Sequence, residues 1–159
     1  MQAEPAQLLM YRFPPGTRLE GGVVGALERM DLAGAPRALD ALFVARDVLS
    51  GELDAVDLAT GRAGGSVVAM LDFRLDPARR RAVTERTFAG HPGGVPAPVV
   101  RAIGAALEPG GAVLVVLVAG DRPADLVDAV YRAGGRLLID ERVDAVTLAA
   151  LVPELLAAR

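Results

Sequence analysis

The chain has 159 residues, a formal net charge of −3 and no cysteine, and all 17 of its basic residues are arginine. This length is typical of one domain that buries a core of its own. The missing cysteine excludes disulfides, thiolate metal sites and thiol nucleophiles, and the missing lysine excludes Schiff-base chemistry and a P-loop lysine. The slightly acidic charge balance provides no positive field for nucleic acid.

The N-terminal residues predict a strand over residues 7–13 and a helix over residues 19–32. Both faces of the strand are apolar, with Leu8 and Met10 on one face and Leu9, Tyr11 and Phe13 on the other. Pro14, Pro15 and Gly16 end it. The apolar stripe expected on the helix consists of Val23, Val24, Leu27 and Met30.

A hairpin is expected next, from a second two-faced strand over residues 37–47 and a third strand over residues 52–58. Ser50 and Gly51 lie between the two strands, where a turn is needed. The third strand alternates charged and apolar residues more openly. Its acidic residues discourage further pairing, which predicts a sheet edge.

Residues 60–95 form an irregular, glycine-rich middle segment. Within it, residues 67–75 suggest an extended piece, and Asp76-Pro77 is a good start for a helix over residues 78–88. A further helix is expected after Pro96, with Val99, Ile103 and Leu107 along one side.

The strongest pattern lies in residues 110–142. An apolar run over residues 112–119 predicts a strand buried on both faces, followed by a helix and a second strand over residues 136–142. We interpret these elements as a βαβ unit with a right-handed crossover. Gly134-Gly135 fits the end of its helix, and an amphipathic helix over residues 147–157 follows the unit.

This order predicts a single α+β domain over residues 1–159, a ferredoxin-like βαββαβ sandwich extended by an additional αβ step and a C-terminal helix. Such a sheet usually carries helices on one face, yet several strands here are apolar on both faces. The terminal helix, the middle segment or another subunit must therefore cover the second face. We favour a homodimer through the sheet or its edge, because two-fold assemblies are the commonest oligomers.

Three segments carry a resemblance to a known family. They are LLMYRF (residues 8–13), GAPRALDALFVARD (residues 34–47) and the stretch from Leu107 to Val143. Together they resemble a family of small actinobacterial proteins of unknown function. The resemblance implies a ferredoxin-like fold, and it supplies no activity, substrate or catalytic residue.

The glycine-rich middle loops contain one candidate ligand site. Gly64 and Gly65 are suited to a backbone nest for an anion, with Arg62 as a bidentate partner, and His91 lies in the later loop AGHPGG. The alternative, which we favour, is that these glycines only make turns and that His91 is an exposed loop residue. The spacing matches neither a Walker A nor a dinucleotide motif.

A second candidate site is acidic. Asp140 and Glu141 end the strand over residues 136–142, and Asp121 opens the preceding crossover helix. Paired carboxylates at such strand ends are able to transfer protons or hold a divalent cation. The favoured alternative is structural, a helix N-cap and a strand-end salt bridge, so we expect neither a metal site nor a catalytic residue.

These observations lead us to expect a non-enzymatic protein that acts through self-association or protein–protein interaction. No cofactor, nucleic acid or membrane partner is expected. The N-terminus has no signal-peptide pattern and no apolar run is long enough for a membrane span, which predicts a cytoplasmic protein. The alternative function is a small-ligand, anion-binding or sensor module that uses the middle loops, and an enzyme is the least expected class.

Overall fold

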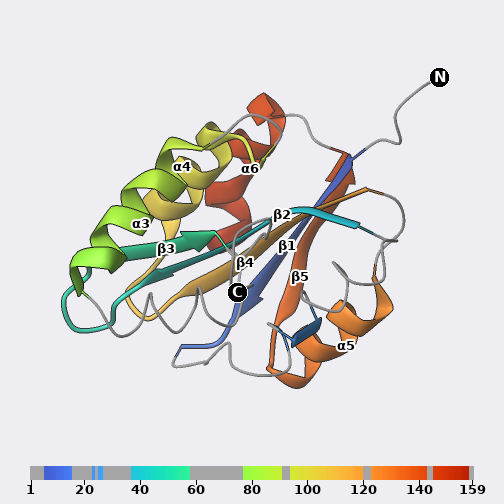
Figure 1. Ribbon diagram of the computed structural model, residues 1–159, viewed down its shortest axis with the longest axis horizontal. Helices are drawn as coiled ribbons and strands as arrows, with labels where there is room; N and C mark the ends of the chain where they lie inside the picture. The colour runs from blue at the N-terminus through green and yellow to red at the C-terminus, as the bar shows by residue number, and fades with distance from the viewer. Residues whose placement is uncertain are drawn as a thin grey trace.

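Five strands form one fully antiparallel sheet in the computed structural model, in the order β3-β2-β4-β1-β5 (Figure 1). The structure describes residues 6–15, 23, 25–26, 37–57, 77–90, 94–119, 123–142 and 145–157. The strands are β1 (Ala6–Phe13), β2 (Arg37–Arg46), β3 (Leu53–Asp57), β4 (Ala112–Ala119) and β5 (Arg136–Arg142). The labelled helices in this described part are α3 (Pro77–Ala89), α4 (Ala97–Ala106), α5 (Ala124–Arg132) and α6 (Ala145–Ala157).

The central strand is β4, and its residues 112–118 are all buried. This confirms the expected burial on both faces. The expected βαβ unit is present as β4, α5 and β5, but β1 lies between its two strands and pairs antiparallel with each. The two strands therefore run in the same direction without being neighbours. An unbroken apolar run reports burial on two faces, and a central antiparallel strand with helices on both sides produces it as readily as a parallel one.

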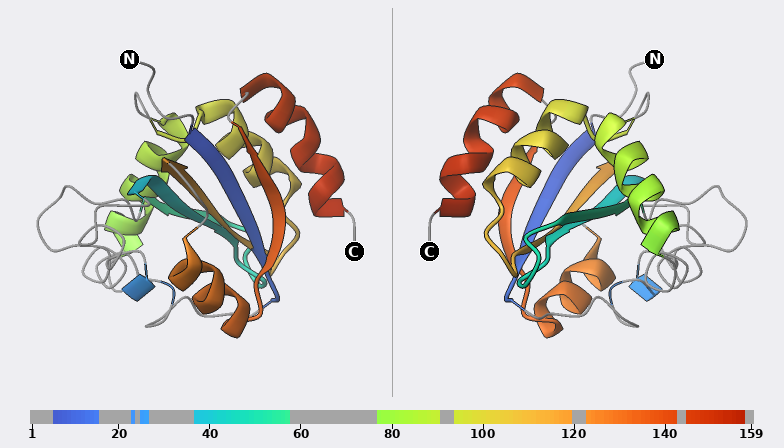
Figure 2. Two further views of the ribbon diagram at one scale, coloured as in Figure 1. Left: turned by 90° about the vertical axis from the view of Figure 1, so that its right-hand side faces the viewer. Right: turned by 90° about the vertical axis from the view of Figure 1, so that its left-hand side faces the viewer.

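Helices of the same chain cover both faces of the sheet (Figure 2). One face packs against α5 through Leu126 and Val130, together with the helical residues Val23 and Ala26. The other face packs against α4 and α6. The expected alternation of β1 is confirmed, because Leu8 and Met10 belong to the α4 side and Leu9, Tyr11 and Phe13 to the α5 side. The second face thus needs no other subunit, and the dimer stays a separate prediction.

Two charged side chains of β2 hold α4 by its two ends. Asp40 is 1% exposed, and its Oδ2 accepts a 2.7 Å hydrogen bond from the Val95 N–H just before α4 begins. At the other end of the strand, Arg46 donates to the carbonyl oxygens of Gly104 and Leu107 at 2.7 and 2.8 Å. A carboxylate near a helix N-terminus and a guanidinium at its C-terminus both suit the helix dipole.

Arg12 of β1 holds the C-terminus of α6, as Arg46 holds the C-terminus of α4. Its Nη1 donates a 3.1 Å hydrogen bond to the carbonyl oxygen of Leu156 in the last turn of α6. Its Nη2 lies 3.9 Å from Oε1 of Glu108. Arg46 is the last residue of β2 and Arg12 the last but one of β1. These strands run in the same direction, so the helices on this face have their C-termini fixed at one end of the sheet.

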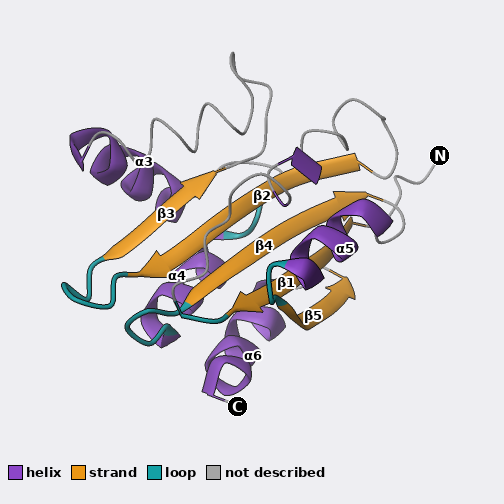
Figure 3. Ribbon diagram, turned by 90° about the horizontal axis from the view of Figure 1, so that it is seen from below, coloured by secondary structure: helices purple, strands orange, loops and turns teal. Residues whose placement is uncertain are grey.

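The edges of the sheet are protected in different ways (Figure 3). β3 is an edge strand, as expected, and α3 lies beside it. The Thr84 hydroxyl of α3 accepts a 3.0 Å hydrogen bond from the Ala55 N–H and donates a 3.2 Å bond to the Ala55 carbonyl. Burial raises the pKa of Asp54 in the same strand. At the opposite edge, a register shift leaves Leu138 of β5 as an extra residue, and such a bulge discourages pairing with another strand.

The remaining expectations for the elements are confirmed where the structure describes them. α3 begins at Pro77, and Gly134 follows α5 with a positive φ of 88°. Val99 and Ile103 of α4 are buried, as is Leu107 directly after the helix. α6 begins two residues earlier than expected, at Ala145. The extended piece expected over residues 67–75 and most of the helix expected over residues 19–32 lie outside the described residues.

We predict that Arg46→Met lowers the free energy of unfolding by about 3 kcal/mol, because it leaves part-buried carbonyl oxygens without their charged donor. Urea denaturation of the purified protein measures this loss. Arg101→Met, which changes an exposed residue of the same helix, is the matched control and should stay within about 0.5 kcal/mol of the parent. Equal stability of the two variants would contradict the role given to Arg46.

Candidate functional site

The candidate ligand site falls outside the described part of the chain. The described residues include none of its four members, Arg62, Gly64, Gly65 and His91. Asp121 of the acidic candidate also lies outside the described residues. The structure therefore tests no contact among these residues. The anion-binding site and its alternative, plain turns with an exposed histidine, both stay predictions.

The acidic candidate is described only at the end of β5. Asp140 lies opposite Leu9 and Glu141 opposite Leu8 in the pairing with β1. Because β1 separates β5 from β4, the carboxyl ends of these two strands are about 10 Å apart, two strand spacings. Across the described ranges, no three histidine, aspartate or glutamate side chains gather in a way that suits a metal ion.

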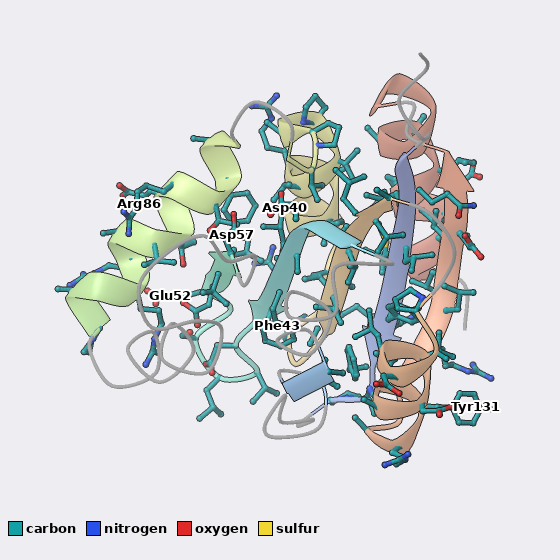
Figure 4. The ribbon with its side chains drawn as sticks, turned by 45° about the vertical axis from the view of Figure 1, so that its right-hand side comes forward. Asp40, Phe43, Glu52, Asp57, Arg86 and Tyr131 are labelled. Atoms are coloured by element: carbon teal, nitrogen blue, oxygen red, sulfur yellow. The ribbon has the colours of Figure 1, made fainter. Side chains whose placement is uncertain are left out.

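Asp40 is a buried carboxylate that the sequence interpretation missed. Its Oδ1 accepts a 3.0 Å hydrogen bond from the Ala41 N–H, in addition to the Oδ2 bond from Val95. A register shift against β4 comes immediately before it, and bulges of this kind re-aim side chains. The sequence does contain a signal for its burial: Asp40 lies two residues before the inward-facing Leu42, so the two side chains share one face of the strand. These bonds give Asp40 a structural role at the start of α4 (Figure 4).

Exposed apolar side chains occur at one end of the sheet, where β1 and β2 end and the other strands begin. In Figure 1 this end runs from the connection between β2 and β3 at the left to the start of β5 at the bottom. The large hydrophobic side chains exposed within the described ranges are Leu49 at 94%, Tyr131 at 79%, Val48 at 64% and Leu137 at 40%. Val48 and Leu49 occupy the turn between β2 and β3. Tyr131 is in the last turn of α5, and Leu137 is the second residue of β5.

Two prolines connect these apolar positions. A Cβ atom at Gly110 would lie 3.4 Å from Cβ of Pro15 and 3.6 Å from Cβ of Val48. A Cβ atom at Gly134 would lie 3.3 Å from Cγ of Pro14. Both glycines have positive φ, 84° and 88°, which L side chains rarely adopt. We call this continuous region, from the Val48 turn across the prolines to Leu137, the strand-end surface.

The turn that carries Val48 and Leu49 is fixed by its own hydrogen bonds. Oδ2 of Asp47 accepts bonds from the N–H groups of Leu49 and Ser50 at 3.0 and 2.7 Å. The bonds from Ser50, followed by the one from Leu49, lower the pKa of the exposed Asp47 carboxyl. Arg46 adds a 2.6 Å bond from Nη1 to the Gly51 carbonyl. The turn is therefore a pre-shaped element that holds two apolar side chains in solvent.

The other part of the strand-end surface contains an open pocket of about 400 Å³. Its lining is formed by Tyr131, Gly134, Gly135, Arg136 and Leu137. Arg136 and the neighbouring Arg132 are exposed, whereas the exposed charged residues of the turn are the acidic Asp47 and Glu52. Each part of the surface thus combines apolar side chains with charged ones, and the charges are positive beside the pocket and negative in the turn.

No family model, curated protein or solved structure matches this chain, so the family resemblance stays a prediction. Within the described ranges, no helix combines the length and the apolar character needed to cross a membrane.

We predict that Asp47→Ala lowers the melting temperature at pH 7 and that this difference shrinks as the pH falls to about 3. The folded-state pKa of Asp47 lies below the usual carboxyl value of about 4. The stabilisation is therefore present above that value and is lost as the pH falls through the folded pKa. Thermal unfolding followed by circular dichroism measures the difference, with Asp128→Ala on α5 as the control for loss of one exposed carboxylate. A difference independent of pH would refute this account of the turn.

Proposed function

We propose that this protein acts by associating with a second copy of itself and catalyses no reaction. The observation that supports this is the strand-end surface, which exposes Val48 and Leu49 in one part and Tyr131 and Leu137 in the other. Single exposed apolar residues are ordinary on a protein surface, whereas a connected group of them usually marks an interaction site. Removing such a group from water is the main favourable contribution to protein association.

The faces and edges of the sheet are covered or protected within the chain, which leaves the strand-end surface for association. Both faces pack against helices of the same chain, and Thr84 of α3 satisfies the outward backbone groups of Ala55 at the β3 edge. The bulge at Leu138 makes the β5 edge a poor template for an added strand. The homodimer expected from the sequence is therefore best supported through the strand ends rather than through a sheet face or edge.

We also propose that four of the strands form the ferredoxin-like core. β1 and β2 run in the same direction with β4 between them, and β4 and β5 run together with β1 between them. This is the split βαβ arrangement of that fold. In this assignment β3 and α3 are the additional elements, placed after β2 at the sheet edge.

Sedimentation equilibrium tests the association. We expect a species of twice the chain mass of 16.5 kDa at micromolar concentration. We also expect a melting temperature that rises by about 4 °C over a hundredfold increase in protein concentration, since association stabilises the folded state by mass action. A monomer whose melting temperature is independent of concentration would refute the proposed function.

A further inference from the structure

We propose that the turn of one copy binds the pocket of a second copy, and that the pocket of the first receives the turn of the second. Here the turn means residues 47–52, and the pocket is the one lined by Tyr131, Arg136 and Leu137. This inference rests on the proposed self-association and names the surface that performs it. The occupant of the pocket is thus a defined segment of an identical chain.

The placement of the two elements allows a closed dimer. The turn follows β2, and the pocket is formed where α5 leads into β5, so both lie at the same end of the sheet. Pro14 and Pro15 lie between them. If two copies meet end to end about a two-fold axis near these prolines, each turn faces the partner's pocket. Such an isologous contact closes at two copies and leaves no open site for a chain of subunits.

The apolar groups match in kind and size. Leu49 projects almost wholly into solvent from its fixed turn, and the pocket offers the apolar side chains of Tyr131 and Leu137. A cavity of about 150 Å³ accommodates a benzene-sized group, so the pocket, at about 400 Å³, has room for Leu49 together with Val48. Aromatic anchors such as Tyr131 are enriched at the centre of protein interfaces.

The charges favour contact of the turn with the pocket over contact of turn with turn or of pocket with pocket. Asp47 and Glu52 accompany the apolar residues of the turn, while Arg132 and Arg136 accompany the pocket, and all four are exposed. Turn against turn would bring carboxylates together, and pocket against pocket would bring guanidinium groups together. Like charges across an interface oppose association, so only turn against pocket combines apolar contact with opposite charges.

The rigidity of the turn reduces the entropic cost of binding. Asp47 holds the backbone at Leu49 and Ser50, and Arg46 holds Gly51. A segment that already has its bound shape loses little conformational freedom on association. The turn therefore enters the interface as a rigid element.

Charge reversal across the interface provides the sharpest test. We expect Glu52→Arg and Arg136→Glu each to raise the dimer dissociation constant about tenfold, and the double variant to return to within about threefold of the parent. Leu49→Asp should abolish the dimer at micromolar concentration while leaving a folded monomer, because Leu49 makes no core contact at 94% exposure. Sedimentation velocity of the full chain measures all four variants.

Arg86→Glu is the matched control, since it makes the same charge change on α3, away from Tyr131 (Figure 4). It should leave the dissociation constant unchanged, and circular dichroism confirms the folding of every variant. A dimer that tolerates Leu49→Asp, or single charge variants that the double variant does not restore, would overturn the pairing of turn and pocket while leaving self-association standing. A parent protein that is monomeric throughout would overturn both proposals.

Discussion

The attachment of α4 to β2 by two opposite charges is the contact on which one side of the molecule depends. Asp40 and Arg46 lie six residues apart on one face of the strand, a span of about 20 Å, which matches the ten residues of α4 together with the residues that flank them. Asp40 fixes the start of the helix and Arg46 its end. Because α6 packs beside α4 on this face, their positions together decide how the second side of the sheet is closed.

Arg46 also couples this core to the strand-end surface. Its side chain reaches the Gly51 carbonyl in the turn, and its backbone carbonyl accepts a 2.8 Å hydrogen bond from the Gly110 N–H. One residue thus fixes the helix end, the turn that carries Leu49 and the connection into β4. Arginine suits this position because its planar guanidinium offers several donors in a fixed fork, whereas a lysine ammonium acts as a point charge.

The sequence was informative where burial has a local signature. The alternation along β1, the unbroken apolar run of β4 and the proline at the start of α3 each placed an element correctly. Local patterns did not reveal that β1 inserts between β4 and β5, since strand order depends on pairing between distant segments. Leu49 escaped notice for a related reason. An apolar pair within a turn has no periodicity, so only the exposed fraction of its side chains distinguishes it from the strand before it.

The composition of the chain, arginine without lysine, does not give its arginines a common role. Arg12 and Arg46 donate hydrogen bonds to carbonyl oxygens at helix ends. Their guanidinium groups therefore stabilise the packing of helices on the sheet. Arg132 and Arg136 are exposed beside the pocket, on the part of the strand-end surface opposite to Asp47 and Glu52. Positive and negative charges are thereby separated along one end of the sheet. A surface with this separation distinguishes two orientations of an identical partner, which apolar contact alone does not, since hydrophobic attraction has no direction.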